Sequence, residues 1–265
     1  MKEKYNFSRK SGKNFETITF MQTPKMKVSG ENRKERNNKI PISDPTASNL
    51  SAKCRAVKRL EFILNNNFIL SEKNTHLTFE ITNKLVDYKG LRKCLDNFIK
   101  TLRSDYSNFK YVWVLDTNKQ GFFHIHMLVN IYFDKDAQKE LSKKWHKKVC
   151  RYYKLNKDNN EKICNLHFTR IFELDHLEGV FHYFMTKPRN TYPIKEIKDK
   201  NKYSSSKNLE KETKSNGLIP FNVREKKKAL EDKYGRINVQ LNSYYDYYAE
   251  TKIYQFKVYK GRFSE

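Results

Sequence analysis

The sequence predicts an α+β fold in which helices pack on a central, mainly antiparallel sheet. Segments with alternating apolar residues, typical of strands, take turns with segments whose apolar residues recur at helical spacing. The expected order of elements over 75–187 is β-α-β-β-α-β-α. Its two middle strands are joined by the short segment TNKQG, which favours an antiparallel hairpin.

Residues 1–50 are expected to form a basic, disordered arm. They hold few large apolar side chains and many Lys, Arg, Asn and Ser, and such a segment buries too little apolar surface to offset the entropy lost on ordering. The chain shows no apolar stretch typical of a signal peptide and no run of membrane-spanning length. We therefore expect a soluble, cytoplasmic protein that is not secreted and has no membrane partner.

Residues 51–189 are the expected folded domain. Its first helix is predicted over 51–66, where apolar residues recur every three or four positions. Alternation of Leu, Phe and Ile with polar residues predicts a strand over 75–82. A stripe of apolar residues predicts a helix over 88–103, which leads to the first hairpin strand over 109–116.

The second hairpin strand is expected over 122–130, and a helix over 134–149 follows it. Residues 165–174 alternate again and predict the last strand of this domain. A helix is then predicted over 175–187, and it is expected to end before Pro188 because proline interrupts the hydrogen-bond ladder.

Two further segments complete the expected organisation. Residues 190–217 are charged, polar and nearly free of aliphatic side chains, so we expect a linker or flexible loop. Residues 218–265 are expected to form a C-terminal extension with a helix and a terminal strand, and the sequence assigns no role to it.

The composition points to a polyanionic partner. The chain has 54 Lys and Arg against 30 Asp and Glu, a formal net charge of +24, and nucleic acid is the most common polyanion inside cells. The 17 Tyr and 18 Phe offer surfaces on which bases can stack. A genome rich in A and T would explain the preference for Lys over Arg, but not the excess over acidic residues. We therefore expect contact with nucleic acid, through residues that the sequence does not identify.

The four cysteines are spaced unlike those of a zinc ribbon or a redox pair. They lie far apart and form no CxxC motif: Cys54, Cys94, Cys150 and Cys164. An intracellular chain would keep them reduced, so we expect buried, unreactive thiols.

The run FFHIHMLVN places two histidines one residue apart. Side chains alternate along a strand, so His124 and His126 point to the same face, where two imidazoles can bind one metal ion. The hairpin would bring the carboxylate of Asp116 beside them. Such a set suits Mg²⁺ or Mn²⁺ held partly by a phosphate, with Zn²⁺ the less favoured ion. The alternatives are packed or surface histidines and an Asp116 that only initiates the turn.

The helix over 175–187 offers a nucleophile. Tyr183 and Lys187 lie four residues apart and so share one helix face. A phenol opposite a metal-bound phosphate, with an ammonium group to neutralise developing charge, suits strand transfer through a covalent intermediate. Packing is the alternative role of Tyr183, and Tyr152 and Tyr153 are its nearest rivals as nucleophile.

Together these motifs resemble the HUH endonuclease domain of rolling-circle replication initiators, and are similar to the replication proteins of small single-stranded DNA phages and plasmids. The resemblance covers roughly 75–187, from LTFEIT through the hairpin to GVFHYFMTK. The segment from His124 to His126 matches the family's His-hydrophobic-His motif. Asp116 matches the acidic ligand that commonly precedes it on the adjacent strand.

The third motif of that family, Tyr-x-x-Lys, is matched less closely. Phe184 stands three residues before Lys187, and Tyr183 stands one residue earlier. This offset leaves two readings, in which either Tyr183 is the nucleophile or the nucleophile has moved or been lost.

The resemblance implies a ferredoxin- or RRM-like topology and a metal-dependent DNA endonuclease that nicks and joins. Tyr183 would attack a phosphate of a single-stranded origin, leaving a 5′-phosphotyrosyl link and a 3′-OH that primes rolling-circle replication. Lys187 would orient or neutralise the phosphate. The chain has no GxxxxGK[ST] motif, so a host helicase and polymerase are the implied partners. Two alternatives remain, a transposase or relaxase with the same chemistry and a catalytically inactive nucleic-acid-binding protein.

Overall fold

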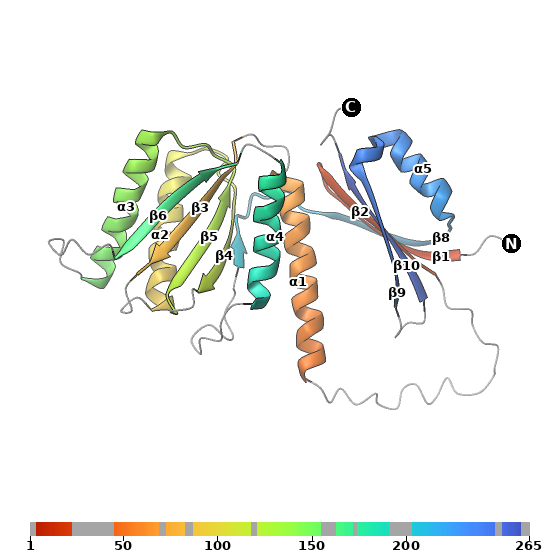
Figure 1. Ribbon diagram of the computed structural model, residues 1–265, viewed down its shortest axis with the longest axis horizontal. Helices are drawn as coiled ribbons and strands as arrows, with labels where there is room; N and C mark the ends of the chain where they lie inside the picture. Colours follow the sequence, from red (N-terminus) through yellow and green to blue (C-terminus); the bar gives the residue numbers. More distant parts are fainter. Residues whose placement is uncertain are drawn as a thin grey trace. The chain divides into compact units, whose positions relative to one another are not determined.

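The computed structural model describes nine stretches of the chain: 4–22, 45–68, 73–82, 87–117, 121–154, 163–171, 174–190, 203–246 and 251–260. The chain divides into two compact units, one made of Met1–Leu70 with Glu210–Glu265 and the other of Ser71–Leu209. Each unit has a five-stranded sheet whose strand pairs are antiparallel (Figure 1). The predicted α+β class is confirmed, with a second sheet that the sequence did not predict.

The unit of residues 71–209 carries the two histidines. In chain order its elements are β3 (Thr75–Ile81), α2 (Tyr88–Asp105), β4 (Tyr111–Thr117), β5 (Phe123–Val129), α3 (Lys135–Tyr153), β6 (Cys164–Arg170), α4 (Leu174–Asn190) and β7 (Tyr203–Ser205). The sheet order is β6-β3-β5-β4-β7. From β3 to β6 this is the β-α-β-β-α-β arrangement of ferredoxin-like folds, and the short β7 extends the sheet beside β4.

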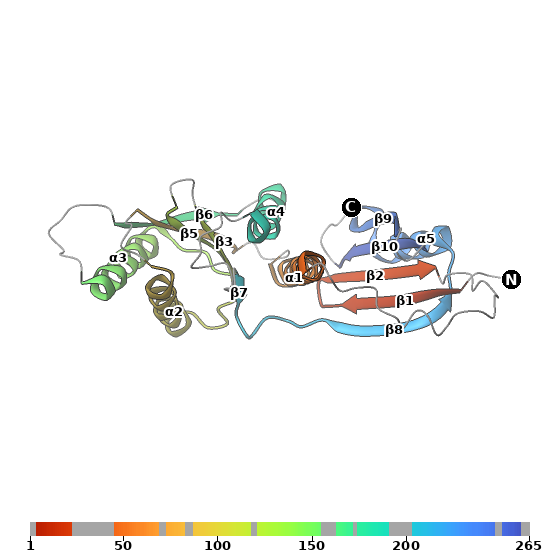
Figure 2. The ribbon, with the colours of Figure 1, turned by 90° about the horizontal axis from the view of Figure 1, so that it is seen from below.

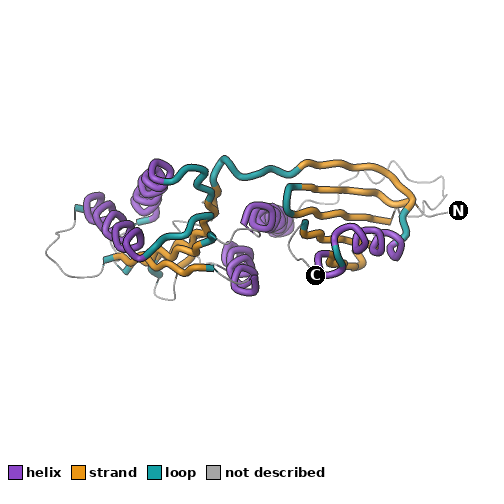
Figure 3. The backbone as a smooth tube through the Cα atoms, turned by 90° about the horizontal axis from the view of Figure 1, so that it is seen from above, coloured by secondary structure: helices purple, strands orange, loops and turns teal. Residues whose placement is uncertain are grey.

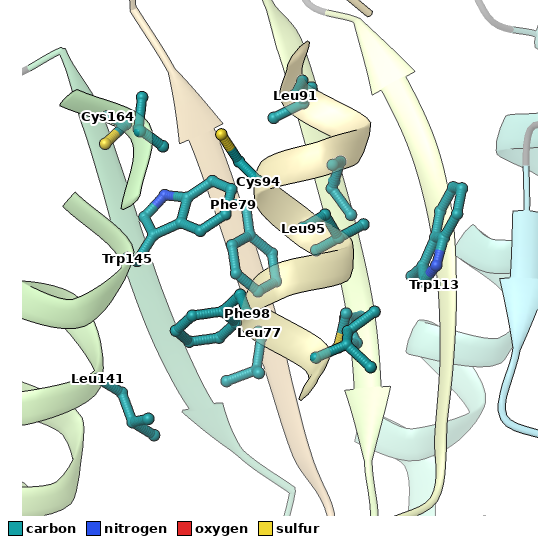
Figure 4. Close-up of a cluster of buried hydrophobic side chains, with 14 of the residues drawn as sticks. Leu77, Phe79, Leu91, Cys94, Leu95, Phe98, Trp113, Leu141, Trp145 and Cys164 are labelled. Carbon is teal, nitrogen blue, oxygen red and sulfur yellow. The ribbon is translucent and has the colours of Figure 1, made fainter. Parts of the chain in front are cut away.

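One face of this sheet carries the core. Alternate residues of the strands point toward α2 and α3, and Figure 4 shows Leu77 and Phe79 of β3 meeting side chains of these helices. The Trp145 ring packs edge-on against Phe79 and Phe98, with ring centroids 4.8 and 5.6 Å apart. Helix α4 lies on the opposite face of the sheet (Figure 2). That face therefore holds the remaining strand side chains, including those of His124 and His126.

The other unit joins both ends of the chain. Its elements are β1 (Lys4–Ser11), β2 (Phe15–Gln22), α1 (Pro45–Phe68), β8 (Thr213–Pro220), α5 (Val223–Tyr234), the 3₁₀ helix Arg236–Asn238, β9 (Val239–Asp246) and β10 (Thr251–Tyr259). The sheet order is β8-β1-β2-β10-β9, so the N-terminal hairpin lies between C-terminal strands (Figure 3). Phe20 and Phe256 are fully buried in the core of this unit.

The prediction of a disordered arm over 1–50 is wrong for residues 4–22, which form β1 and β2. In β2, Ile18 and Phe20 alternate with threonines and are buried. They gain a partner only because β10 pairs with β2 from more than 200 residues away. Local apolar content therefore underestimated what this segment can bury. Helix α1 also begins at Pro45, before the expected boundary at residue 51, whereas residues 23–44 lie outside the described part of the chain.

Two other boundaries also differ. The expected linker 190–217 contains β7 and most of β8, whose side chains are largely exposed and so give no apolar signal. The segment 218–265 is no separate extension, because its strands complete the sheet of β1 and β2. Helix α4 continues to Asn190, past Pro188, because a proline removes one bond of the helical ladder while later residues keep helical dihedrals.

Three of the cysteines, Cys94, Cys150 and Cys164, are buried free thiols, as expected. Burial raises the pKa of Cys94 to about 11 and that of Cys164 to about 12. The side chain of Cys54 lies outside the described residues. Among the helices that the structure describes, none combines the length and apolar character needed to cross a membrane.

Candidate active site

The β4–β5 hairpin aligns the predicted acidic residue with the first histidine. Asp116 and His124 are direct partners in the antiparallel register, and opposed side chains lie on the same face with Cβ atoms about 5 Å apart. His126 is the next residue on this face, whereas Ile125 and Met127 point into the core. The carboxylate and both imidazoles therefore lie on the face covered by α4.

Tyr183 of α4 reaches into this group. Its hydroxyl donates to Asp116 Oδ2 at 2.9 Å and lies 2.8 Å from His126 Nε2. The ring of Tyr183 meets the His126 ring edge-on, with centroids 4.5 Å apart. Burial, together with the hydrogen bond to the Asp116 carboxylate, raises the pKa of Tyr183 well above its usual range. The phenol therefore keeps its proton at neutral pH in this arrangement.

A second histidine supports His126 from β3. His76 Nε2 lies 3.2 Å from His126 Nδ1, and the two rings stack with centroids 5.3 Å apart. Thr78 Oγ1 lies 3.4 Å from the same nitrogen. Burial and the charge of His176 lower the pKa of His76 to about 4, so His76 is neutral at neutral pH. Sequence reasoning missed His76, although its position opposite Leu77 in the β3 alternation would have placed it on this face.

Glu80 is the second residue that sequence reasoning missed. It is the register partner of His124 on the other neighbouring strand, β3. Its Oε1 lies 3.7 Å from His124 Nε2, and its Oε2 lies 3.4 Å from both Asn165 Nδ2 and His167 Nε2. Burial alone would raise the pKa of Glu80, but these contacts lower it, so the carboxylate is charged at neutral pH. The signal was the alternation of β3, which leaves Glu80 opposite the core residues Phe79 and Ile81.

The donors fit a divalent ion in type, since two imidazoles and a carboxylate share one face. His124 Nε2 is buried and makes no hydrogen bond within the described part of the chain, which leaves its lone pair free for a ligand. The donors do not converge on one point, however, because the described residues include no group of three His, Cys, Asp or Glu with metal-binding geometry. The Tyr183 hydroxyl instead bridges Asp116 and His126.

The other candidates lie apart from this group. Lys187 is in α4, four residues after Tyr183, but its side chain is outside the described residues. The Tyr153 hydroxyl donates to Asp87 Oδ1 at 2.9 Å, where Asp87 caps α2. Tyr152 lines a cavity with residues of α2. Both rival tyrosines thus belong to the helical layer on the far face of the sheet from His124.

Comparison with known proteins associates this unit with replication. A family model for replication-associated proteins of the ORF2 type matches residues 74–192, less than half of the 265-residue chain. A search of curated proteins found no match. The crystal structure of the hypothetical protein ORF119 from Sulfolobus islandicus rod-shaped virus 1 is similar at a TM-score of 0.32 and 11% identity, covering 52% of this chain and 99% of that one. The family match spans the strands and the helix that carry His76, Asp116, His126 and Tyr183, and it connects this span with replication-associated proteins.

Proposed function

We propose that the protein is a replication initiator that nicks one strand of single-stranded origin DNA through a tyrosine nucleophile. The observation that carries the proposal is the position of the Tyr183 hydroxyl, which lies within hydrogen-bond distance of both Asp116 and His126. A nucleophile beside a base that is itself oriented by another group is the arrangement expected of covalent catalysis. The family match at residues 74–192 supports a role in replication.

In the proposed step the Tyr183 oxygen attacks the phosphorus of a phosphodiester. The P–O bond to Tyr183 forms, the bond from phosphorus to the 3′-oxygen breaks, and the phosphate stays on the 5′ end as a phosphotyrosyl ester. The phenol proton passes to Asp116, its present acceptor at 2.9 Å, and the leaving 3′-oxygen takes a proton from solvent. The resulting 3′-OH primes synthesis by a host polymerase, with unwinding by a host helicase.

Asp116, His124 and His126 would hold a divalent ion, Mg²⁺ or Mn²⁺ in preference to Zn²⁺. When bound, the ion would polarise the scissile phosphate as a Lewis acid. His76 would fix the ring of His126 through Nδ1, as distal hydrogen-bond partners do at metal-ligating histidines. Lys187, one turn beyond Tyr183, would neutralise charge on the phosphate. A transposase or relaxase would use the same chemistry on a different DNA.

A second candidate function is nucleic-acid binding without catalysis. The observation in its favour is that three metal ligands do not converge within the described residues. Formation of a covalent adduct distinguishes the two functions, because a binding protein forms none.

The test uses single-stranded fragments that tile the genetic element encoding the protein, mixed with the protein and Mn²⁺. The proposed chemistry transfers the 3′-labelled part of the fragment to the protein, so this label migrates with the protein on a denaturing gel. The 5′-labelled part is released with a 3′-OH that a polymerase extends. Tyr183→Phe should abolish the adduct while the protein still binds DNA, because phenylalanine keeps the ring but has no oxygen to attack phosphorus.

The matched controls are Tyr152→Phe and Tyr153→Phe, which remove the same atom on the other face of the sheet. Both controls should retain the adduct. An adduct that survives Tyr183→Phe but is lost in one of the controls would show that the nucleophile is misassigned. A wild-type protein that binds the fragments and never forms an adduct would favour the binding function.

A further inference from the structure

The helical face of the unit of residues 71–209 contains a basic groove that the proposed chemistry does not use. A cavity of about 720 Å³ lies between α2 and α3 and adjoins a second one of about 270 Å³. The two cavities share Thr101, Lys148 and Arg151 in their walls, so they form one continuous groove. We call this feature the α2–α3 groove.

The α2–α3 groove is strongly cationic. Five basic side chains line it against a single carboxylate, that of Asp105: Lys100, Lys144, Lys147, Lys148 and Arg151. Asp105 is already engaged, since its Oδ2 accepts from Lys144 Nζ at 3.3 Å. Within the described part of the chain, the other four cations have no carboxylate within ion-pair distance. Like charges held this close repel one another, and a bound polyanion relieves that repulsion.

The spacing of these cations suits an extended ligand. Lys144, Lys147, Lys148 and Arg151 follow one another at i, i+3, i+4 and i+7 along α3, which places them in one stripe. At 1.5 Å per residue the stripe is on the order of 10 Å long, and a nucleic-acid strand in a duplex carries one phosphate about every 3.4 Å. The stripe therefore matches about three successive phosphates of one strand.

The groove also has the uncharged groups that a nucleic-acid backbone needs. Asn97, Thr101 and Ser104 of α2 provide hydrogen-bonding side chains along one wall. At one end lies Tyr152, with 38% of its surface exposed, and an accessible ring is a platform on which a base can stack. These aromatic and polar groups favour nucleic acid over an acidic peptide as the occupant.

We infer that the α2–α3 groove binds the sugar–phosphate backbone of nucleic acid. The groove and Tyr183 lie on opposite faces of one sheet (Figures 1 and 2), so the groove holds a second stretch of nucleic acid and not the phosphate that Tyr183 would attack. The inference does not depend on the proposed chemistry, because it concerns binding alone.

The test compares two variants of the full-length protein that lose the same charge. The groove variant carries Lys100→Gln, Lys148→Gln and Arg151→Gln. The control carries Lys135→Gln, Lys139→Gln and Lys143→Gln, three residues of α3 that do not line the groove. Circular dichroism checks that both variants fold. Affinity is measured by fluorescence anisotropy with labelled single-stranded and duplex oligonucleotides of equal length, in EDTA and over a series of salt concentrations.

The groove variant should bind at least one of the two oligonucleotides about tenfold more weakly. Its log–log salt slope for that oligonucleotide should be shallower by about 2, since each lost phosphate contact removes roughly 0.7 on single strands and about 0.9 on duplex. The oligonucleotide that shows the change identifies the form of nucleic acid held. The control should keep the wild-type slope.

Two outcomes would overturn the inference. Equal losses in both variants would mean that net charge alone, and not the groove, governs affinity. Unchanged nucleic-acid binding by the groove variant, with loss of binding to labelled polyglutamate, would mean that the groove takes an acidic protein segment.

Discussion

Tyr183 lies within a chain of hydrogen bonds that runs from Asp116 through His126 to His76. A phenol has one proton, so while Tyr183 donates to Asp116 its oxygen can only accept from His126 Nε2–H. His126 Nδ1 then carries a lone pair and accepts from His76 Nε2–H. Binding of a metal ion to His126 Nε2 would reverse this order, because Nδ1 would carry the proton and donate to His76. His76 can serve both states because neutral imidazole can donate or accept.

His76 is therefore predicted to position His126. His76→Leu should lower the nicking rate by about 10–100-fold, the usual effect of losing a group that orients a metal ligand. His76→Gln should restore much of the rate, because an amide can donate or accept in place of the imidazole. Initial rates at several Mn²⁺ concentrations check this prediction, with the loss expected as a weaker apparent affinity for Mn²⁺. Equal rates in the Leu and Gln variants would contradict it.

The two histidines of β5 are predicted to be needed for nicking. His124→Ala and His126→Ala should each lower the initial rate by at least about 100-fold, and EDTA should stop the wild-type reaction until Mn²⁺ or Mg²⁺ is added. The matched control is His182→Ala, which alters an exposed histidine next to Tyr183 on α4 and should keep the wild-type rate. Normal nicking in EDTA would rule out the metal site.

At the scale of elements, the β1–β2 hairpin is held by a buried carboxylate. Glu16 is 1% exposed, and Arg9 donates to its two oxygens at 2.7 and 2.9 Å. Lys260 Nζ lies 3.0 Å from Oε2 and links β2 to the end of β10. Burial alone would raise the pKa of Glu16, but the hydrogen bonds from Arg9 and Lys260 outweigh it and the pKa lies below its ordinary value of 4.5.

A lowered pKa in the folded state means that Glu16 stabilises the fold fully above pH 4.5, and that this contribution is lost as the pH falls through the lower folded value. Glu16→Gln should lower the free energy of unfolding of this unit by about 2 kcal/mol at neutral pH, the typical loss for charged hydrogen bonds. The difference from wild type should shrink below pH 4.5, where the wild-type carboxyl is also neutralised. Hydrogen exchange of the β1 and β2 amides measures both values, and a difference that stays constant with pH would refute the assignment.

At the scale of the whole molecule, each unit has a core of its own. The largest core cluster contains only residues between Leu77 and Cys164, within the unit of residues 71–209. The other core combines Tyr5, Ile18 and Phe20 from the N-terminal hairpin with residues of α5, β9 and β10. The unit that holds β1 and β2 thus depends on both ends of the chain.

Deletion of residues 1–22 is accordingly predicted to unfold one unit and leave the other intact. It removes β1 and β2, the strands between β8 and β10, so the remaining strands lose their hydrogen-bonding partners and half of their core. Limited proteolysis should degrade residues 210–265 quickly and spare the span around residues 73–190. Persistent protection of the β10 amides after the deletion would show that the C-terminal strands fold without the hairpin.

The sequence by itself determined the α+β class, the β-α-β-β-α-β order and the placement of Asp116 beside His124. These features follow from local rules, namely the alternation of side chains along a strand and the antiparallel register of a short hairpin. The same alternation placed His124 and His126 on one face, opposite Ile125.

Only the tertiary structure decided which other groups meet those histidines. His76 and Glu80 reach them because β3 pairs with β5, across nearly 50 residues of sequence, and Tyr183 reaches them because α4 covers that face. The pairing of β2 with β10 likewise turned an apparently disordered arm into the centre of a sheet. A strand that buries one face needs a partner, and no local pattern of residues records where in the sequence that partner lies.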